Sequence, residues 1–332
     1  MIDLEKDGLT QTIMSLFVGV TPVTISRTIT SMNISPIHSP NQRNLRYSIP
    51  NSKKVMGALM GRKNIMKKIH AFYNFKGGTG KTSICYQAGC HLSLLGYKVL
   101  LVDADPQAHL TSSVGINDFG ELETLYDCIV QGKNVHDLIK NVYEGLDIVP
   151  ANLSLTRLEP ELNNMARREE RLSIEMIPLK TKYDFIFIDT NPTISILNRN
   201  VIEFSDYLEI VAETHPFSLT GLRFLVEDLD KFYTQMQLPP RPLNIIPNKY
   251  EDRSSNSAEA MAALRKYYSK SLKLDFAIRK SEEIITSSKI SKPLALFVKK
   301  NSIALEDIIE LGNYILTISS SAEEIEEINE KN

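Results

Sequence analysis

The sequence contains few cysteines and no long apolar segment. Its three cysteines, Cys85, Cys90 and Cys128, are an odd number without Cys-x-x-Cys spacing, which indicates neither a disulfide framework nor a zinc site. No apolar run approaches the roughly 20 residues that a membrane-spanning helix needs. The acidic start, Met1–Asp7, is unlike a signal peptide. These absences predict a cytoplasmic protein that is not inserted in a membrane.

Charge is distributed unevenly along the 332 residues, although the formal net charge is only −2. Residues 1–68 contain ten Lys and Arg against three Asp and Glu, and the remainder contains 28 against 37, so the two parts carry +7 and −9. With 42% hydrophobic and 23% charged residues, the composition is that of a globular protein, and the length exceeds one average domain. A small basic domain on a larger acidic one predicts an anionic partner, nucleic acid first, with a merely solvated basic linker as the alternative.

The basic part contains a pattern typical of two short helices joined by a turn. Gly19 supplies the turn, Thr21 is a favourable N-cap, and Pro22 suits the first position of the second helix. The residues predicted to face the core are Ile13, Leu16, Phe17, Ile25 and Ile29. The pattern resembles a helix-turn-helix whose second helix reads DNA; a protein-interaction domain built on the same apolar spacing is the alternative. On the DNA-binding interpretation, the contacting residues are Thr21, Val23, Thr24 and Arg27.

The segment after the second helix extends this interpretation. Ile34–Ile49 has the pattern of a hairpin around residues 41–44, and we expect Arg43 and Arg46 to form a basic wing that contacts DNA. Lys53–Lys68 is predicted to be a basic linker or helix. The expected organisation is therefore a helix-turn-helix domain over residues 1–50, a linker over 51–68 and a second domain over 69–332.

The second domain is organised around a glycine-rich loop, which lies between the apolar run Ile69–Tyr73 and a helix-like run that starts near Ser83. A strand, a glycine loop and a helix in this order predict a phosphate-binding site, because glycines let backbone amides turn towards an anion and the helix adds its positive end. Lys81 is expected to contact the β- and γ-phosphates, and Thr82 to bind Mg²⁺. The residues predicted to hold the nucleotide are Gly77, Gly78, Thr79, Gly80, Lys81, Thr82 and Ser83.

Acidic residues follow two further buried strands. Residues 98–102 lead into Asp103 and Asp105, and residues 183–188 lead into Asp189. Because the carboxyl ends of parallel strands meet at one edge of a sheet, we expect these carboxylates beside the phosphates. Asp189 has the arrangement of a Walker B carboxylate that holds Mg²⁺, usually through a water, and simple helix capping is the alternative for Asp103 and Asp105. Between these strands, the segments predicted to be helical are Leu122–Val130, Val135–Val142 and Leu153–Lys180.

With Lys76 opening the loop, Lys76-Gly77-Gly78-Thr79-Gly80-Lys81-Thr82 resembles the deviant Walker A motif of the ParA/MinD ATPases, and Asp103-Ala104-Asp105-Pro106-Gln107 resembles their second motif. The resemblance covers residues 69–320. It implies a P-loop NTPase fold, with a mostly parallel twisted sheet flanked by helices, that binds ATP or ADP with Mg²⁺. It also implies slow hydrolysis by a homodimer, in which Lys76 reaches the nucleotide of the other subunit. By the same resemblance, Asp105 orients the attacking water and Asp103 helps to hold the metal.

The resemblance extends to side chains outside these motifs. An amide after a late strand often contacts adenine in the family, which makes Asn248 a candidate base reader, although Asn is also a common turn residue. The family usually has Asp-Thr-Pro-Pro where this chain has Asp-Thr-Asn-Pro; the change, at Asn191, leaves the metal role of Asp189 intact. In the ATP-bound dimer of such proteins, basic C-terminal residues contact DNA without sequence preference, whereas exposed basic pairs are otherwise only solvated. The candidates here are Arg279, Lys280, Lys299 and Lys300.

The leading function is a DNA-segregation ATPase of the nucleoid whose hydrolysis is stimulated by a ParB-like centromere-binding protein, and which represses its own operon. The alternative is a nucleotide-controlled transcriptional regulator without a transport role. An iron–sulfur reductase like the nitrogenase iron protein needs two suitably placed cysteines, which Cys128 alone does not supply. A MinD-like membrane role is disfavoured because the acidic tail Glu323–Asn332 lacks a basic amphipathic helix. The operator, the replicon, the partner and the nucleotide that favours operator binding stay open, as does the choice between dimers and filaments on DNA.

Overall fold

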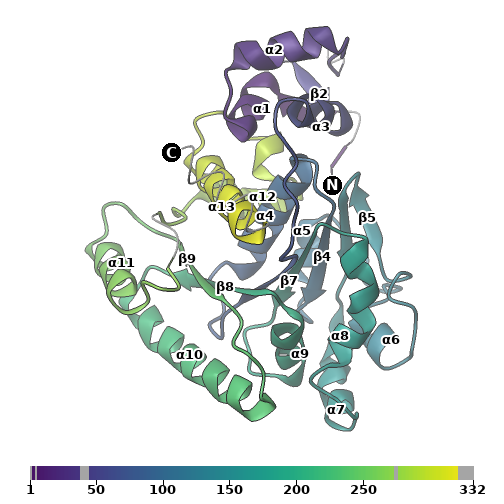
Figure 1. The fold of residues 1–332 in the computed structure, drawn as a ribbon, viewed down its shortest axis with the longest axis vertical. Helices are drawn as coiled ribbons and strands as arrows, with labels where there is room; N and C mark the ends of the chain where they lie inside the picture. Colours follow the sequence, from purple (N-terminus) through teal and green to yellow (C-terminus); the bar gives the residue numbers. More distant parts are fainter. Residues whose placement is uncertain (1, 4–5, 38–44, 273–275, 321–332) are drawn as a thin grey trace.

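A computed structural model describes residues 2–3, 6–37, 45–272 and 276–320. Within them, a seven-stranded sheet lies between two layers of helices (Figure 1). The strand order is β5-β6-β4-β7-β3-β8-β9, and every neighbouring pair is parallel except β5 and β6. The strands are β3 Ile69–Tyr73, β4 Val99–Ala104, β5 Lys140–Tyr143, β6 Leu146–Val149, β7 Phe185–Thr190, β8 Tyr207–Glu213 and β9 Leu243–Asn248. This architecture confirms the predicted α/β class with a mostly parallel sheet.

Alternate residues along the central strands face the two helical layers. In β4, Val99 and Leu101 pack in one apolar core, and Leu100 and Val102 pack in the other. The helices on the first face are α4 Lys81–Leu94, α5 His109–Ser113, α12 Glu282–Ile290 and α13 Ile303–Ser319, with the short 3₁₀ helix η3 Leu294–Leu296. Those on the second face are α6 Leu125–Ile129, α7 Leu158–Asn163, α8 Arg171–Met176, α9 Ile196–Phe204, α10 Pro216–Met236 and α11 Ser255–Tyr267, with η1 Leu153–Arg157 and η2 Ile177–Thr181.

Two predictions for the middle of the chain were wrong. Residues 135–142 form no helix; instead Lys140–Tyr143 is the edge strand β5, which pairs antiparallel with β6 around a bulge. The predicted long helix over residues 153–180 is divided into η1, α7, α8 and η2. Arg167 has a left-handed φ of +53°, which breaks the helix between α7 and α8, and Pro178 lies in η2.

A smaller N-terminal unit, formed by the described part of residues 6–57, lies at one end of the molecule (Figure 1). Its antiparallel strands β1 Gly8–Thr10 and β2 Arg46–Ser48 are accompanied by α1 Gln11–Val18, α2 Pro22–Ser31 and α3 Ile49–Gly57. Gly19 ends α1 with a left-handed φ of +70°, and the Thr21 hydroxyl caps α2 by accepting the Thr24 N–H at 3.2 Å. Lys53–Lys68, the segment predicted to be a linker or helix, begins inside α3 and extends beyond its end at Gly57.

The two helices α1 and α2 differ from the prediction in one respect. Met14 is fully buried, whereas Leu16, predicted to face the core, is 41% exposed. The predicted positions Ile13, Phe17 and Ile25 are buried. Among the described residues, no single helix is long and apolar enough to cross a membrane; α1 and α2 reach that length and composition only as a pair, which is bent by 108°.

The N-terminal unit packs against α4 and η3, and its buried side chains belong to one continuous core with those of α4 and α13. The Phe17 ring meets the His91 ring of α4 edge-on, with the centroids 4.5 Å apart. A Cβ atom on Gly312 of α13 would lie 2.2 Å from His91 Cδ2, so this glycine permits the close approach of α13 to α4. Lys292 and Asp7 add an ion pair across the boundary at 2.7 Å.

Candidate nucleotide-binding site

The glycine-rich loop connects β3 to α4, which begins at Lys81. Gly78 and Gly80 have left-handed φ angles of +77° and +95°, which favour glycine over any residue with a Cβ. A Cβ on Gly80 would also lie 2.4 Å from Asn248 Nδ2. Gly80 is the N-cap and offers no side-chain hydrogen bond to α4, so the first N–H groups of this helix remain for an anion.

Thr82 and Asp189 meet directly below the loop. The Thr82 hydroxyl donates to Asp189 Oδ2 at 2.6 Å, and Asp189 Oδ1 is buried without a hydrogen-bond partner among the described residues. Burial and the nearby Asp103 carboxylate raise the pKa of Asp189 well above its ordinary value, although Thr82 and Lys81 act in the opposite direction. Burial lowers the pKa of Lys81. A hydroxyl, an unpartnered carboxylate oxygen and a lysine ammonium are groups that fit Mg²⁺ and a phosphate.

Asp103 organises the loop that carries Asp105. Its Oδ1 accepts the Asp105 N–H at 3.1 Å, and its Oδ2 accepts the N–H and the hydroxyl of Thr111 at 2.9 and 2.7 Å. Burial raises the pKa of Asp103 to about 6, against the lowering effect of these hydrogen bonds. Asp105 is 8% exposed, and its Oδ1 accepts the Gln107 N–H at 2.9 Å. Loop capping therefore accounts for the contacts that the structure gives to Asp103.

Two residues of the site, Glu213 and Lys249, were missed in the sequence. Glu213 ends β8, and its Oε2 accepts a hydrogen bond from Lys76 Nζ while its Oε1 accepts one from Lys249 Nζ at 2.7 Å. Lys249 Nζ also donates to the Gly78 carbonyl. The signal that could have found them is their position, because Glu213 is the last residue of β8 and Lys249 directly follows β9, and both strands end beside the loop that follows β3.

Asn248, the candidate base reader, is hydrogen-bonded to the backbone of the glycine-rich loop. It is 4% exposed, and its Nδ2 donates to the Thr79 carbonyl at 2.7 Å. Next to the loop lies a cavity of about 580 Å³, whose walls include Lys76, Thr214 and Ser254. This volume is in the range of small-molecule sites.

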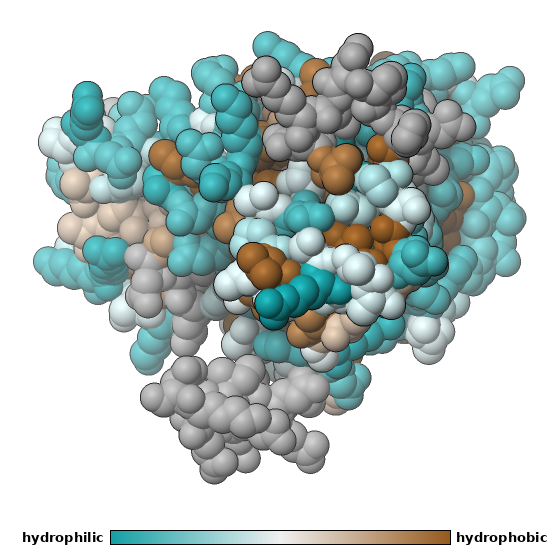
Figure 2. Space-filling model, turned by 90° about the horizontal axis from the view of Figure 1, so that it is seen from above, coloured by the Kyte–Doolittle hydropathy of each residue, from teal (hydrophilic) through white to brown (hydrophobic). Residues whose placement is uncertain are grey.

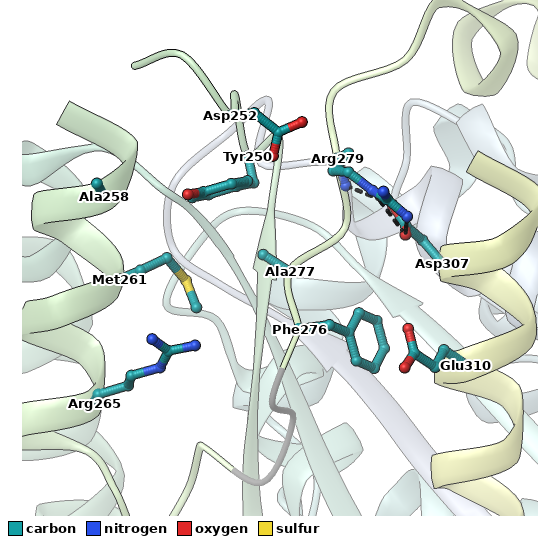
Figure 3. A pocket seen from close by; sticks show the side chains of 10 residues that line it. All are labelled: Tyr250, Asp252, Ala258, Met261, Arg265, Phe276, Ala277, Arg279, Asp307 and Glu310. Atoms are coloured by element: carbon teal, nitrogen blue, oxygen red, sulfur yellow. Dashed lines mark hydrogen bonds and ion pairs between the residues drawn. The ribbon is translucent and has the colours of Figure 1, made fainter. Parts of the chain in front are cut away.

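Arg279, predicted to contact DNA, is bound to acidic side chains of its own chain. Its N–H and its Nε donate to Asp307 Oδ2 and Oδ1 at 2.8 and 3.1 Å, and Nη2 donates to Glu306 at 3.0 Å. Asp307 is only 1% exposed, and its hydrogen bonds raise the pKa of Arg279 further. Figure 3 shows this ion pair at a cavity of about 410 Å³ whose walls include Tyr250 and Phe276. The charge of Arg279 is therefore balanced within the chain.

The other three C-terminal candidates are at the surface. Lys280 pairs with Glu251 at 2.8 Å. Lys299 and Lys300 are exposed and lie where the N-terminal unit meets the sheet domain, beside a cavity of about 650 Å³ that is also lined by residues 10–13. These two lysines are thus the C-terminal candidates for which the structure gives no ion pair among the described residues.

The DNA-binding candidates at and in α2 lie at the surface, whereas Arg46 is bound to other parts of the chain. Val23 is 59% exposed, Arg27 is exposed, and the hydroxyls of Thr21 and Thr24 lie 3.0 Å apart at the start of α2. Figure 2, which looks onto the end of the molecule where α2 lies, shows apolar patches between hydrophilic side chains.

Arg46 has a different environment from the wing residue that was predicted. Its Nη1 donates to the carbonyls of Gly8 and Leu296, both at 2.7 Å, so the guanidinium joins the N-terminal unit to η3. The strand that pairs with β2 is β1, and a hydrogen bond from the Ile37 N–H to the Arg46 carbonyl at 2.8 Å links the described ends of the predicted hairpin. Arg43 lies outside the described residues, as does the acidic tail.

Comparison with known proteins identifies the family. A family profile described as "AAA domain" matches residues 66–239. The chain is 30% identical over 240 residues to an uncharacterised protein of Mycobacterium tuberculosis, covering 72% of this chain and 75% of that protein. It is 32% identical over 204 residues to the sporulation initiation inhibitor protein Soj of Bacillus subtilis, covering 61% of this chain and 81% of Soj. The chain belongs to the ParA/MinD family of partition ATPases.

Solved structures agree with the fold of this ParA/MinD family member. An ATP complex of McdA from Cyanothece matches with a TM-score of 0.68 and 23% identity, over 76% of this chain and 97% of that one. In the present ParA/MinD chain, the glycine loop, the Asp103 loop and Asp189 all lie at the carboxyl edge of the sheet, where Asp103 and Asp189 are direct register partners on β4 and β7.

Proposed function

We propose that this ParA/MinD family member binds ATP or ADP with Mg²⁺ and hydrolyses ATP to drive DNA segregation. The observation that carries the proposal is the contact of Thr82 with Asp189, whose second carboxylate oxygen is buried without a partner in the described part of the chain. In this proposal the Thr82 hydroxyl and Asp189, the latter through a water, hold Mg²⁺, and Lys81 and the loop N–H groups bind the phosphates. The ATP complex of Cyanothece McdA supports ATP as the ligand.

The phosphates are an essential part of this metal site. The described residues contain no group of three or more Asp, Glu, His or Cys side chains that could hold a metal ion by themselves. Mg²⁺ often binds through one or two protein groups, with waters and phosphate oxygens as the other ligands. The metal and the nucleotide are therefore proposed to bind together.

Hydrolysis needs a water in line with the γ-phosphorus and a positive charge where negative charge develops. Asp105, on the loop that Asp103 and Thr111 hold in place, is the residue proposed to orient the water. Lys76 is proposed to supply its charge to the nucleotide of a second copy of the chain. A single subunit then turns over slowly, and a ParB-like partner that stabilises the complete dimer stimulates hydrolysis.

DNA binding is proposed at two places. The ATP-bound dimer binds DNA without sequence preference through Lys299 and Lys300, whereas Arg279 and Lys280 contribute less because they are paired with acids. The N-terminal unit binds the operator of its own operon through α2, for which the exposed Val23 is supporting evidence together with the 108° bend between α1 and α2. The protein would then act in the cytoplasm, on the nucleoid.

Footprinting on the DNA upstream of the protein's own coding sequence tests this proposal, with no nucleotide, ADP and ATP in parallel. Uniform protection that requires ATP supports the segregation function, and a discrete protected site supports operator binding. The Arg27→Ala variant should weaken the discrete site much more than binding to random DNA; equal loss on both means that Arg27 contacts phosphate. A discrete site under nucleotide control without any ATP-dependent coating would instead favour a transcriptional regulator.

A further inference from the structure

The carboxylate of Glu213 has a different lysine on each oxygen. Lys76 Nζ donates to Oε2, and Lys249 Nζ donates to Oε1 at 2.7 Å. The Glu213 side chain is 20% exposed, and those of Lys76 and Lys249 are 46% and 43% exposed. The three residues come from the ends of the adjacent strands β3, β8 and β9, so one acid bridges the glycine loop and the segment after β9.

The backbone of Lys76 is connected to β8, the strand whose last residue, Glu213, binds its side chain. Its N–H donates to Asn74 Oδ1 at 3.0 Å, and Asn74 Nδ2 donates to the Val211 carbonyl of β8 at 2.8 Å. With its ammonium on Glu213, Lys76 forms part of the wall of the 580 Å³ cavity of its own subunit. In this position the ammonium is bound to a carboxylate of its own subunit, while the Lys76 side chain stays 46% exposed.

We propose that Glu213 is a latch that holds Lys76 inside its own subunit until a second, nucleotide-loaded copy of the chain competes for the ammonium. This inference rests on the proposed role of Lys76 across the dimer. The phosphates of a nucleotide carry more negative charge than one carboxylate, so they can attract Lys76 away from Glu213. Lys249 remains on Glu213 when Lys76 leaves, which keeps the carboxylate paired and accounts for two lysines sharing one acid.

The latch makes dimerisation weaker than the interface alone would allow, because one Lys76–Glu213 contact is broken in each subunit. A partly exposed ion pair of this kind changes an equilibrium by about 1.4-fold to fivefold. Since the factor enters once per subunit, neutralising Glu213 should lower the dissociation constant of the ATP-bound dimer by about twofold to 25-fold. The side chains of Lys76, Lys249 and Glu213 are between 20% and 46% exposed, so salt screens both ion pairs and the effect on the dissociation constant should be smaller at high salt.

The first test is the dimer dissociation constant of the full chain in ATP and Mg²⁺, measured by sedimentation for the wild type, Glu213→Gln and Glu227→Gln. Glu227→Gln is the matched control, because it removes the same charge from an exposed ion pair with Arg223 on α10. Tighter dimerisation of Glu213→Gln, with the control unchanged, supports the latch. Unchanged or weaker dimerisation of Glu213→Gln overturns it.

A second measurement does not depend on dimerisation. Acylation of Lys76 in the nucleotide-free protein, followed by peptide mass spectrometry, should be about 1.4-fold to fivefold faster in Glu213→Gln, because the amine is no longer held by the carboxylate. An unchanged labelling rate overturns the latch even if the dimer forms normally. Failure of the wild type to dimerise with ATP overturns the proposed cross-dimer function instead, and the labelling result then decides on the Glu213 contact by itself.

Discussion

His91 provides a quantitative test of how the N-terminal unit is attached to the sheet domain. The ring is buried between Phe17 and Gly312, and neither ring nitrogen has a hydrogen-bond partner among the described residues. Burial alone lowers the pKa of His91 from 6.5 to about 3. Between these two values the unfolded chain binds a proton at His91 and the folded protein does not.

The sign of the pH effect follows from this difference. Because the folded-state pKa lies below the unfolded value, the stability that the neutral ring permits is fully present above about pH 6.5 and is lost as the pH falls towards 3. The loss is about 1.4 kcal/mol for each pH unit below the unfolded pKa. Between pH 7.5 and 5.5 it amounts to about 1.4 kcal/mol in total.

The assay compares the wild type with His91→Leu, which replaces the ring by an apolar side chain that does not titrate. Urea unfolding followed by circular dichroism gives the free energy of unfolding of both proteins from pH 7.5 to 5.5. The difference should move by about 1.4 kcal/mol in favour of the variant as the pH falls, since all other titrating groups are common to both proteins. A difference that does not change with pH would refute the reasoning, because it would mean that the folded protein protonates His91 as easily as the unfolded chain.

Four further predictions concern the dimer, the reaction and two glycines that lie within helices. Lys76→Ala should abolish ATP-dependent dimerisation and hydrolysis while a fluorescent ATP analogue still binds; turnover at the wild-type rate would contradict the cross-dimer role. Asp105→Ala should remain on DNA after ATP addition, as measured by dissociation kinetics, and rapid ATP-dependent release would argue against its role in orienting water. In thermal unfolding, Gly312→Ala should lower the free energy of unfolding by about 1–3 kcal/mol, because the new Cβ would overlap His91. In the part of the chain that the structure describes, a Cβ on Gly221 would meet no atom within 4 Å beyond its chain neighbours and the backbone of its own helix, so Gly221→Ala should raise the free energy of unfolding by about 0.5–1 kcal/mol.

The sequence predicts those parts of the site that are encoded in short, continuous segments. Asp103 and Asp189 each end an apolar run, and a run of this kind is the pattern of a strand buried on both faces. The edge strand β5 was mistaken for a helix because Tyr143 is its one fully buried residue, so Lys140–Tyr143 lacks the alternation that identifies a strand. Strands at the edge of a sheet carry less of this signal than strands at its centre.

Contacts between distant segments could not be predicted from the sequence. Arg46 binds the carbonyl of Leu296, 250 residues away, and Lys76 binds Glu213, 137 residues away. A basic residue in a DNA-binding pattern looks the same in the sequence whether its charge faces solvent or a carbonyl group of another element. The exposure of Arg27 and the internal pairing of Arg279 therefore became distinguishable only when the chain was folded.

The core that the N-terminal unit shares with α4 and α13 limits how this protein can be recombined. Deleting residues 1–57 would remove Ile13, Phe17 and Val55 from the core that they share with α4 and α13, and would expose apolar surface of α4. The N-terminal unit therefore cannot be exchanged alone. A chimera with a different N-terminal unit would also need matching apolar residues on α4 and α13. During evolution, substitutions in the N-terminal unit and in α4, the helix that begins at the glycine loop, should therefore occur in pairs.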